Sequence, residues 1–200
     1  MPIPETHPLP FFLPPQARLL MLGSFPPKPN RWSMPFFYPN LQNDMWRIMG
    51  LLFFNDKDHL LTPDHKAFDQ PRIQAFCSEQ GIALGDTATE VIRLRDNASD
   101  QFLEVVQRID LSATLAALPQ LQAIVTTGQK ATDTLLSLIE AQEPSIGSNT
   151  TFQFEGRTLQ LFRMPSSSRA YPKPLTEKAA IYRQMFEQLG MLPAHEFQNH

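Results

Sequence analysis

The pattern of apolar and polar positions predicts four strands that alternate with helices along the chain. Residues 18–24 form a continuous apolar run that ends in Gly-Ser, which is typical of a strand buried on both faces. Residues 82–84, 121–127 and 157–163 are the other three predicted core strands. Residues 151–154 precede the last of them across a Glu-Gly pair, and this arrangement indicates a hairpin.

Apolar residues at helical spacing predict a helix after each of several loops. The clearest run carries Met45, Trp46, Ile48 and Met49 on one face. Asp110 or Ser112 is a candidate N-cap for the helix predicted at 111–118. Gly81 and Gly190 end two further predicted helices. The predicted helices cover residues 43–53, 63–81, 111–118, the segment after Gly128, and 174–190.

Strands that alternate with helices imply right-handed crossovers and a sheet covered on both faces. We therefore expect an α/β protein: a three-layer α/β/α sandwich around a central, mostly parallel, four-stranded sheet. Its 200 residues correspond to about one domain. Residues 1–16 form a proline-rich N-terminal arm, anchored by Phe11, Phe12 and Leu13, and residues 191–200 form a C-terminal tail.

Composition narrows the class of protein. The single cysteine, Cys77, rules out an internal disulfide framework and a cysteine-ligated iron–sulfur cluster. No signal peptide and no run of about 18 apolar residues is visible, so we expect a cytoplasmic protein with no membrane partner. A net charge of −3 argues against a partner bound mainly by bulk electrostatics, although a local basic rim remains compatible with DNA.

Ligands of doubly wound sheets bind beyond the carboxyl ends of the strands, and that rule selects the loops after residues 24, 84, 127 and 163. The first loop, Gly23-Ser24-Phe25-Pro26-Pro27, combines a glycine that permits close approach of a ligand with two prolines that stiffen the backbone. It could equally be a plain structural turn. No glycine spacing typical of nucleotide-binding loops is present.

A second candidate is the segment from Phe36 to Trp46, where aromatic residues precede Asn-Leu-Gln-Asn and the start of a helix. Tyr38 would offer a stacking platform and Asn43 a hydrogen bond to a flat heterocycle. The alternative is that Asn43 caps the helix and the aromatic residues pack in the core.

The third candidate is the loop from residue 163 to residue 173. Three consecutive hydroxyls, Ser166, Ser167 and Ser168, lie beside the cations Arg169 and Lys173, and such groups suit contacts with DNA phosphates. An ordinary solvated loop is the alternative.

Other chemistries have weaker support. The five histidines lack the spacing of metal ligands, and no Gly-x-Ser-x-Gly elbow occurs. Asp86, just after a strand, is the carboxylate best placed to polarise water or substrate, and Asp100 is a second candidate. Either aspartate could instead form a turn.

Taken together, these elements resemble the uracil-DNA glycosylase superfamily, nearest the branch of hypoxanthine-DNA (deoxyinosine) glycosylases and mismatch-specific uracil enzymes. The order is the same: Gly-x-x-Pro after the first strand, an aromatic-x-x-x-x-Asn-x-aromatic-Trp motif, and a Pro-Ser loop after the last strand. The motif runs without a gap from Tyr38 to Trp46, with Met45 at one aromatic position. The likeness covers residues 18–189.

The resemblance implies a role for each matching residue. Residues 23–27 would form the sugar and water side of a base pocket, Tyr38 would stack on the extruded base, and Asn43 would be catalytic. Residues 165–168 would grip phosphates, with Arg169 or Tyr171 near the base stack. The sequence departs from the uracil enzymes at Phe25, in place of a water-activating Asp or Asn, and at Met164, in place of a His or Asn.

The function implied is excision of a deaminated base, hypoxanthine or uracil, from DNA in base-excision repair. We expect a monomeric hydrolase with no cofactor and no metal, which leaves an abasic site, because neither Lys28 nor Lys130 has surroundings that would make it an imine-forming nucleophile. Two alternatives stay open: a catalytically silent nucleic-acid or nucleobase-binding protein on the same fold, and a hydrolase of free nucleosides or nucleotides.

Overall fold

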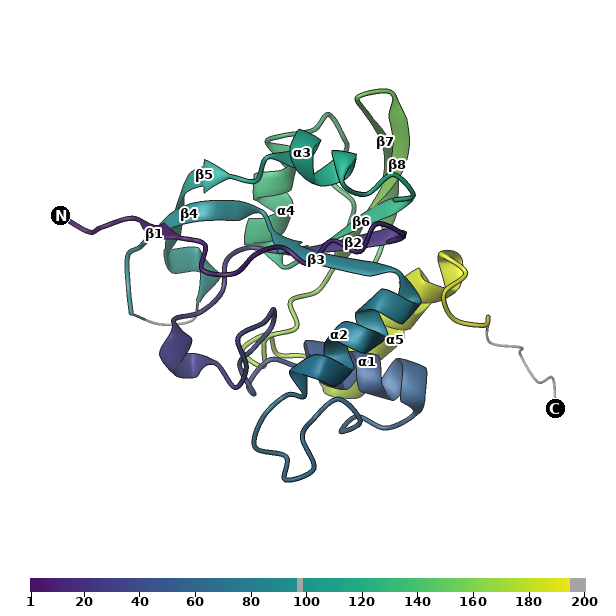
Figure 1. Ribbon diagram of the computed structural model, residues 1–200. Coiled ribbons are helices and arrows are strands. Elements are labelled where there is room, and N and C mark those ends of the chain that lie inside the picture. The colour runs from purple at the N-terminus through teal and green to yellow at the C-terminus, as the bar shows by residue number, and fades with distance from the viewer. Residues whose placement is uncertain (97–98, 195–200) are drawn as a thin grey trace.

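The computed structural model describes residues 1–96 and 99–194, and within them the chain builds two β-sheets flanked by helices (Figure 1). One predicted segment, the C-terminal tail, lies outside the described residues from residue 195 onwards.

The central sheet contains all four predicted strands and one more. Its order is β3-β2-β6-β8-β7, with the first four strands parallel and β7 antiparallel to β8. The expected four-stranded sheet is therefore wrong in its count, because the predicted hairpin partner joins the same sheet. Glu155 and Gly156 both have positive φ, of 47° and 79°, which suits a tight two-residue hairpin. The strands are β2 (Leu19–Gly23), β3 (Ile82–Asp86), β6 (Ala123–Thr127), β7 (Asn149–Phe154) and β8 (Arg157–Met164).

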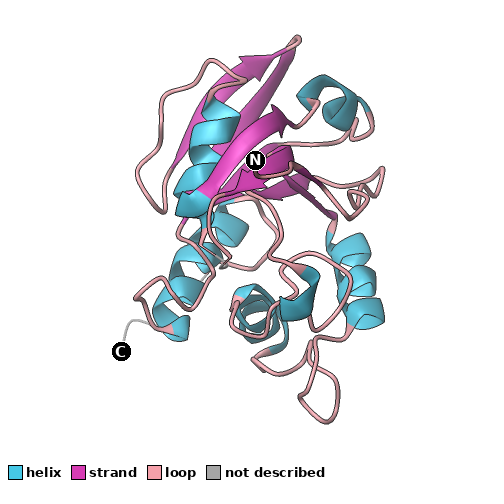
Figure 2. Cartoon of the chain, turned by 90° about the vertical axis from the view of Figure 1, so that its left-hand side faces the viewer, coloured by secondary structure: helices cyan, strands magenta, loops and turns pink. Residues whose placement is uncertain are grey.

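Alternate residues of the central strands enter two separate cores, which confirms the three-layer arrangement. In β2, Leu19 and Met21 pack with α1, α2 and α5, whereas Leu20 and Leu22 pack with α3 and α4. Figure 1 shows these two groups of helices on opposite sides of the sheet, and Figure 2 shows the same layers from the N-terminal side. The helices are α1 (Met45–Phe54), α2 (Gln70–Gln80), α3 (Leu111–Ala116), α4 (Gln129–Leu136) and α5 (Leu175–Gln188).

The helix predicted over residues 63–81 is much shorter in the structure. It begins at Gln70, after Asp69 accepts a hydrogen bond from the backbone N–H of Arg72. Pro71 explains the difference, because proline lacks the N–H that a helix interior requires and fits only in the first turn. The preceding residues form a loop closed by a bridge between Leu61 and Phe68.

A second, antiparallel sheet was not predicted. It has the order β1-β4-β5, formed by β1 (Glu5–Thr6), β4 (Ala88–Arg93) and β5 (Leu103–Arg108). Thr87 separates β3 from β4, and its backbone N–H bonds Gly23, so the two sheets join beside the first loop. The N-terminal arm crosses both sheets: β1 pairs with β4, and Phe12 forms a bridge with Leu84 of β3.

Candidate active site

The predicted loops meet at one edge of the central sheet. Gly23 and Asp86 are direct partners at the ends of β2 and β3, and Thr127 and Met164 are partners at the ends of β6 and β8. Because these four strands are parallel, their carboxyl ends bring the loops that follow them to the same place. Two short 3-10 turns, Pro29–Arg31 and Asp100–Phe102, lie in the connections nearby.

Asp86 is the last residue of β3 and not the first of a turn, and only 6% of its surface is exposed. Its Oδ2 accepts a hydrogen bond from Nε2 of His7 at 2.7 Å. Its Oδ1 faces Gly23, where an added Cβ would lie only 2.7 Å away. Position 23 therefore requires glycine, because a side chain there would clash with this carboxylate. Gly23 thus does more than form a turn.

Tyr38 joins the same edge from the second predicted segment. Its hydroxyl lies 3.0 Å from Oγ1 of Thr127, at the end of β6, and its ring meets that of Trp46 edge-on. Its backbone has a φ of 50°, in the left-handed region that tyrosine rarely adopts. Burial raises the pKa of the hydroxyl well above its usual range. The surrounding structure thus holds Tyr38 in one orientation.

Asp100 adds a second carboxylate to this edge, from the connection between β4 and β5. Ser24 of the first loop donates a hydrogen bond to it, and its Oδ2 is 3.9 Å from where a Cβ on Gly128 would lie. Burial raises the pKa of this carboxyl, and the negative charge of Asp86 raises it further. The edge of the sheet therefore carries two carboxyl groups, those of Asp86 and Asp100.

Phe25 and Pro26 are directed toward the second sheet. Phe25 packs in a small apolar cluster with Val91 and Leu103, and its ring meets that of His7 at 5.3 Å. The carbonyl of Pro26 accepts a hydrogen bond from Arg93. Phe25 thus anchors the loop, and its ring is buried at the position where the resembling uracil enzymes carry a polar side chain.

Asn43 lies just before α1, beside the serine loop. Its Oδ1 accepts a hydrogen bond from the backbone N–H of Met45 at 2.9 Å, so the amide oxygen acts as a cap. Its backbone pairs with Ser168 in an isolated bridge. The amide nitrogen, which is the donor that stabilisation of a leaving base needs, takes no part in this cap.

Two of the three serines hold the loop's own backbone. The hydroxyl of Ser166 accepts from the N–H of Ser168, and that of Ser168 accepts from the N–H of Ala170. Ser167 is buried, and its carbonyl accepts from the N–H of Asp44. The loop is therefore shaped by internal turns and by α1, and Ser166 and Ser168 keep partial exposure.

A buried ionic network, which the sequence did not reveal, ties this loop to α1 and α5. The carboxylate of Asp44 pairs with Arg169 at 3.1 Å, Lys178 at 3.4 Å and Arg47 at 3.7 Å. Lys178, only 1% exposed, also donates to the carbonyl of Ser168 at 2.9 Å. Arg169 is thus not a free phosphate ligand, although its side chain remains 46% exposed.

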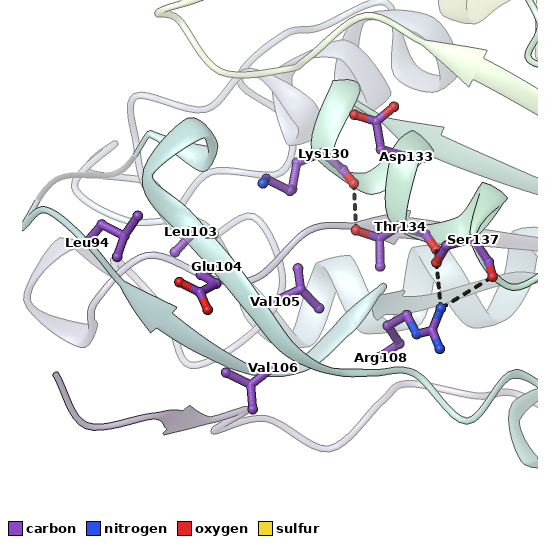
Figure 3. Close-up of a pocket in the computed structure, with 10 residues that line it drawn as sticks. All are labelled: Leu94, Leu103, Glu104, Val105, Val106, Arg108, Lys130, Asp133, Thr134 and Ser137. Atoms are coloured by element: carbon purple, nitrogen blue, oxygen red, sulfur yellow. Dashed lines mark hydrogen bonds between the residues drawn. The ribbon is translucent and has the colours of Figure 1, made fainter. Parts of the chain in front are cut away.

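A groove of about 520 Å³ lies elsewhere, between β5 and α4 (Figure 3). Its polar lining includes Glu104, Arg108 and Lys130, and Arg108 donates hydrogen bonds across it to Ser137. None of the predicted site residues lines this groove.

The described residues, 1–96 and 99–194, contain no group of three or more His, Cys, Asp or Glu side chains that could hold a metal ion. No helix among them is long and apolar enough to span a bilayer.

Comparison with known proteins supports the fold. No protein-family model matches the chain, and no curated protein matches it. The solution NMR structure of a Methanosarcina acetivorans protein, provisionally described as a uracil DNA glycosylase, is similar with a TM-score of 0.59 and 22% identity. The match covers 88% of this chain and 96% of that one. The chain therefore has a fold similar to that of the Methanosarcina protein.

Proposed function

We propose that the chain is a DNA glycosylase that hydrolyses the N-glycosidic bond of a deaminated base, of the hypoxanthine or uracil class. The observation that carries this proposal is the buried carboxylate of Asp86 at the carboxyl edge of the sheet, next to Gly23 and on the same edge as Tyr38. The similar fold of the Methanosarcina protein supports the same class of activity.

The reaction proposed needs a base for water and a donor for the leaving group. The target nucleotide is first extruded from the duplex, at a cost of a few kcal/mol that is least for a mismatched or deaminated base. Water then attacks C1′ and loses a proton to Asp86, while the C1′–N bond breaks and its electron pair leaves with the base. The amide nitrogen of Asn43 donates a hydrogen bond to the departing base and stabilises its charge. The step requires no cofactor.

The remaining site residues position the DNA. The left-handed backbone of Tyr38 and its bond to Thr127 hold an aromatic ring beside the carboxylate, and we assign that ring to stacking on the extruded base. For phosphates, the serine loop supplies partly exposed hydroxyls and two cations, Lys173 and Arg169. The side chain of Arg169 remains 46% exposed beside Asp44.

The central experiment is incubation of the protein with labelled oligonucleotides that carry uracil, hypoxanthine or xanthine, followed by alkaline cleavage at abasic sites. Release of at least one of these bases is expected. The absence of release from every substrate would refute the proposed activity.

Asn43→Asp is the sharpest variant for the leaving-group donor, because it keeps the oxygen that caps Met45 but removes the amide donor. Loss of one transition-state donor typically costs about 100- to 1000-fold in rate. Asn40→Asp is its matched control, because Asn40 also accepts a backbone N–H bond at 2.9 Å, from Gln42. Equal rates in the two variants would remove Asn43 from the mechanism.

DNA binding is tested with the double variant Arg169→Ala, Lys173→Ala. If both cations contact phosphates, binding should weaken on all sequences and the salt slope should fall by about 2. A double variant of two distant cations, Lys57→Ala with Lys66→Ala, is the control. An unchanged salt slope for the Arg169, Lys173 variant would show that DNA binds to another surface of the protein.

A silent nucleobase-binding protein is the second candidate, and two positions favour it. Phe25 and Met164 are both buried apolar side chains where the resembling uracil enzymes carry polar catalytic groups. Such a protein would bind DNA with a deaminated base more tightly than undamaged DNA but release nothing. The same oligonucleotide panel, read by binding as well as by cleavage, separates the two functions.

A further inference from the structure

Nothing in the sequence distinguishes His7 from the other histidines, yet the fold places it in contact with Asp86. The two residues are separated by 79 positions, and their side chains are only 5% and 9% exposed. The distance of 2.7 Å between Nε2 and Oδ2 is that of a strong, charge-assisted hydrogen bond. Residues of the N-terminal arm therefore reach the carboxyl edge of the central sheet.

The backbone of Leu9 contacts Nδ1 of His7, the ring nitrogen that does not face Asp86. Nδ1 lies 3.2 Å from the backbone nitrogen of Leu9 and 2.9 Å from its carbonyl oxygen. In a neutral ring with the proton on Nε2, Nδ1 accepts from that N–H. In the charged ring, it donates to that carbonyl. In both of these forms Nε2–H donates to Oδ2 of Asp86.

Aromatic rings enclose the imidazole and fix its plane. Phe11 and Phe25 meet it edge-on at 5.4 and 5.3 Å, and Phe37 lies at 6.0 Å. The arm does not depend on His7 for attachment, because β1 already pairs with β4, and Phe12 forms a bridge with Leu84. The arm is therefore attached to both sheets independently of the contact between His7 and Asp86.

Asp86 needs a fixed orientation if it is to act as a base. The hydrogen bond from His7 to Oδ2 fixes the carboxylate, so that Oδ1 remains on the side of Gly23.

We propose that His7 is a positioning residue for Asp86, and that the N-terminal arm is thereby a part of the catalytic machinery. This inference rests on the proposed glycosylase function. In the reaction, Oδ1 of Asp86 takes the proton of the attacking water, while Nε2–H of His7 keeps its bond to Oδ2 and does not itself touch the substrate.

The experiment compares His7→Phe with His7→Gln under single-turnover conditions, on the base that the parent protein releases best. Phenylalanine preserves the aromatic packing but removes the donor, whereas the amide of glutamine restores a donor near the position of Nε2. We expect His7→Phe to release the base about 10- to 100-fold more slowly with unchanged DNA affinity, and His7→Gln to recover most of that loss. His59→Phe, at a histidine stacked on Phe54, is the control.

The outcomes are distinguishable. A thermal midpoint for His7→Phe close to that of the parent, with slow release and recovery in His7→Gln, supports the inference. Equal rates for the parent and His7→Phe overturn it while the glycosylase function stands. Equal losses of rate in His7→Phe and His7→Gln also overturn it, because the hydrogen-bond donor at position 7 would then not account for the rate of base release. If the parent releases no base at all, the proposed function is refuted, and the inference is refuted with it.

Discussion

Asp44 and Asp86 are two aspartates that the fold buries almost equally, with 5% and 6% of their surfaces exposed, but their electrostatic surroundings are opposite. Asp44 is paired with three cations, Arg47, Arg169 and Lys178. Asp86 pairs with His7, and its negative charge raises the pKa of a second acid, Asp100.

This difference distinguishes a carboxylate that stabilises the fold from the one that we propose to be reactive. Asp44 bonds cations through both of its oxygens, and these bonds hold the serine loop against α1 and α5. Asp86 is bonded to His7 through Oδ2, and its Oδ1 faces a glycine at the carboxyl edge of the sheet. A buried carboxylate that keeps one oxygen toward such an edge is the better candidate for proton transfer.

Asp86→Asn should have the largest effect on activity. It replaces the carboxylate with an amide of similar size, so base release should fall by about 100- to 10,000-fold, the usual contribution of a general base. Single-turnover kinetics on the best substrate measures the loss, and circular dichroism checks the fold. Release within a factor of about three of the parent would exclude Asp86 as the base.

Asp44→Ala should instead act on stability. It leaves Lys178 buried without a counter-ion, and breaking a buried pair in this way costs about 3–5 kcal/mol of unfolding free energy. Urea denaturation measures the change. Adding Lys178→Met should recover much of it, because the unpaired charge is then removed. A loss below about 1 kcal/mol in the single variant would show that the network is not a structural clamp.

Gly23→Ala tests the closeness of Asp86 to the first loop. The new Cβ would lie 2.7 Å from Oδ1, so the carboxylate must move, and overpacking of this kind costs about 1–3 kcal/mol. Base release should slow as well. Urea denaturation in the parent and in an Asp86→Ala background measures the clash, which should shrink when the oxygen is absent. The same cost in both backgrounds would contradict this geometry.

Asp100→Asn should have the smallest effect, and its sign depends on pH. Burial raises the pKa of this carboxyl in the folded protein, so the folded state binds the proton more tightly than the unfolded state does. The parent therefore loses stability as pH rises from the unfolded pKa through the raised folded value. The uncharged asparagine escapes this penalty, so the variant should be more stable than the parent at pH 7. This advantage should disappear below about pH 4, near the pKa of an unperturbed aspartate. Urea denaturation at both pH values is the measurement, and an advantage independent of pH would rule out the titration of Asp100 as its cause.

Much of the fold was predictable, because the core strands carry their signal locally. The apolar runs of β2 and β6 identify buried strands without any tertiary information, and β8 is marked by the hairpin signal before it. The second sheet was missed for the opposite reason. In its strands β4 and β5 half of the residues are polar, and they become strands through pairing with each other and with the arm. Pro71 did carry a usable signal, since it marks the first turn of α2.

The sequence by itself determined which strand ends meet at the edge where we place the candidate site. Parallel strands that end in Gly23, Asp86 and Thr127 deliver these residues to one edge whatever the loops do. The tertiary structure alone decided which groups meet there. His7 bonds Asp86 across 79 positions, and Lys178 bonds Asp44 across 134. No local pattern encodes such pairs, because the free energy that holds them comes from the packing of the arm and of α5 against the sheet and α1.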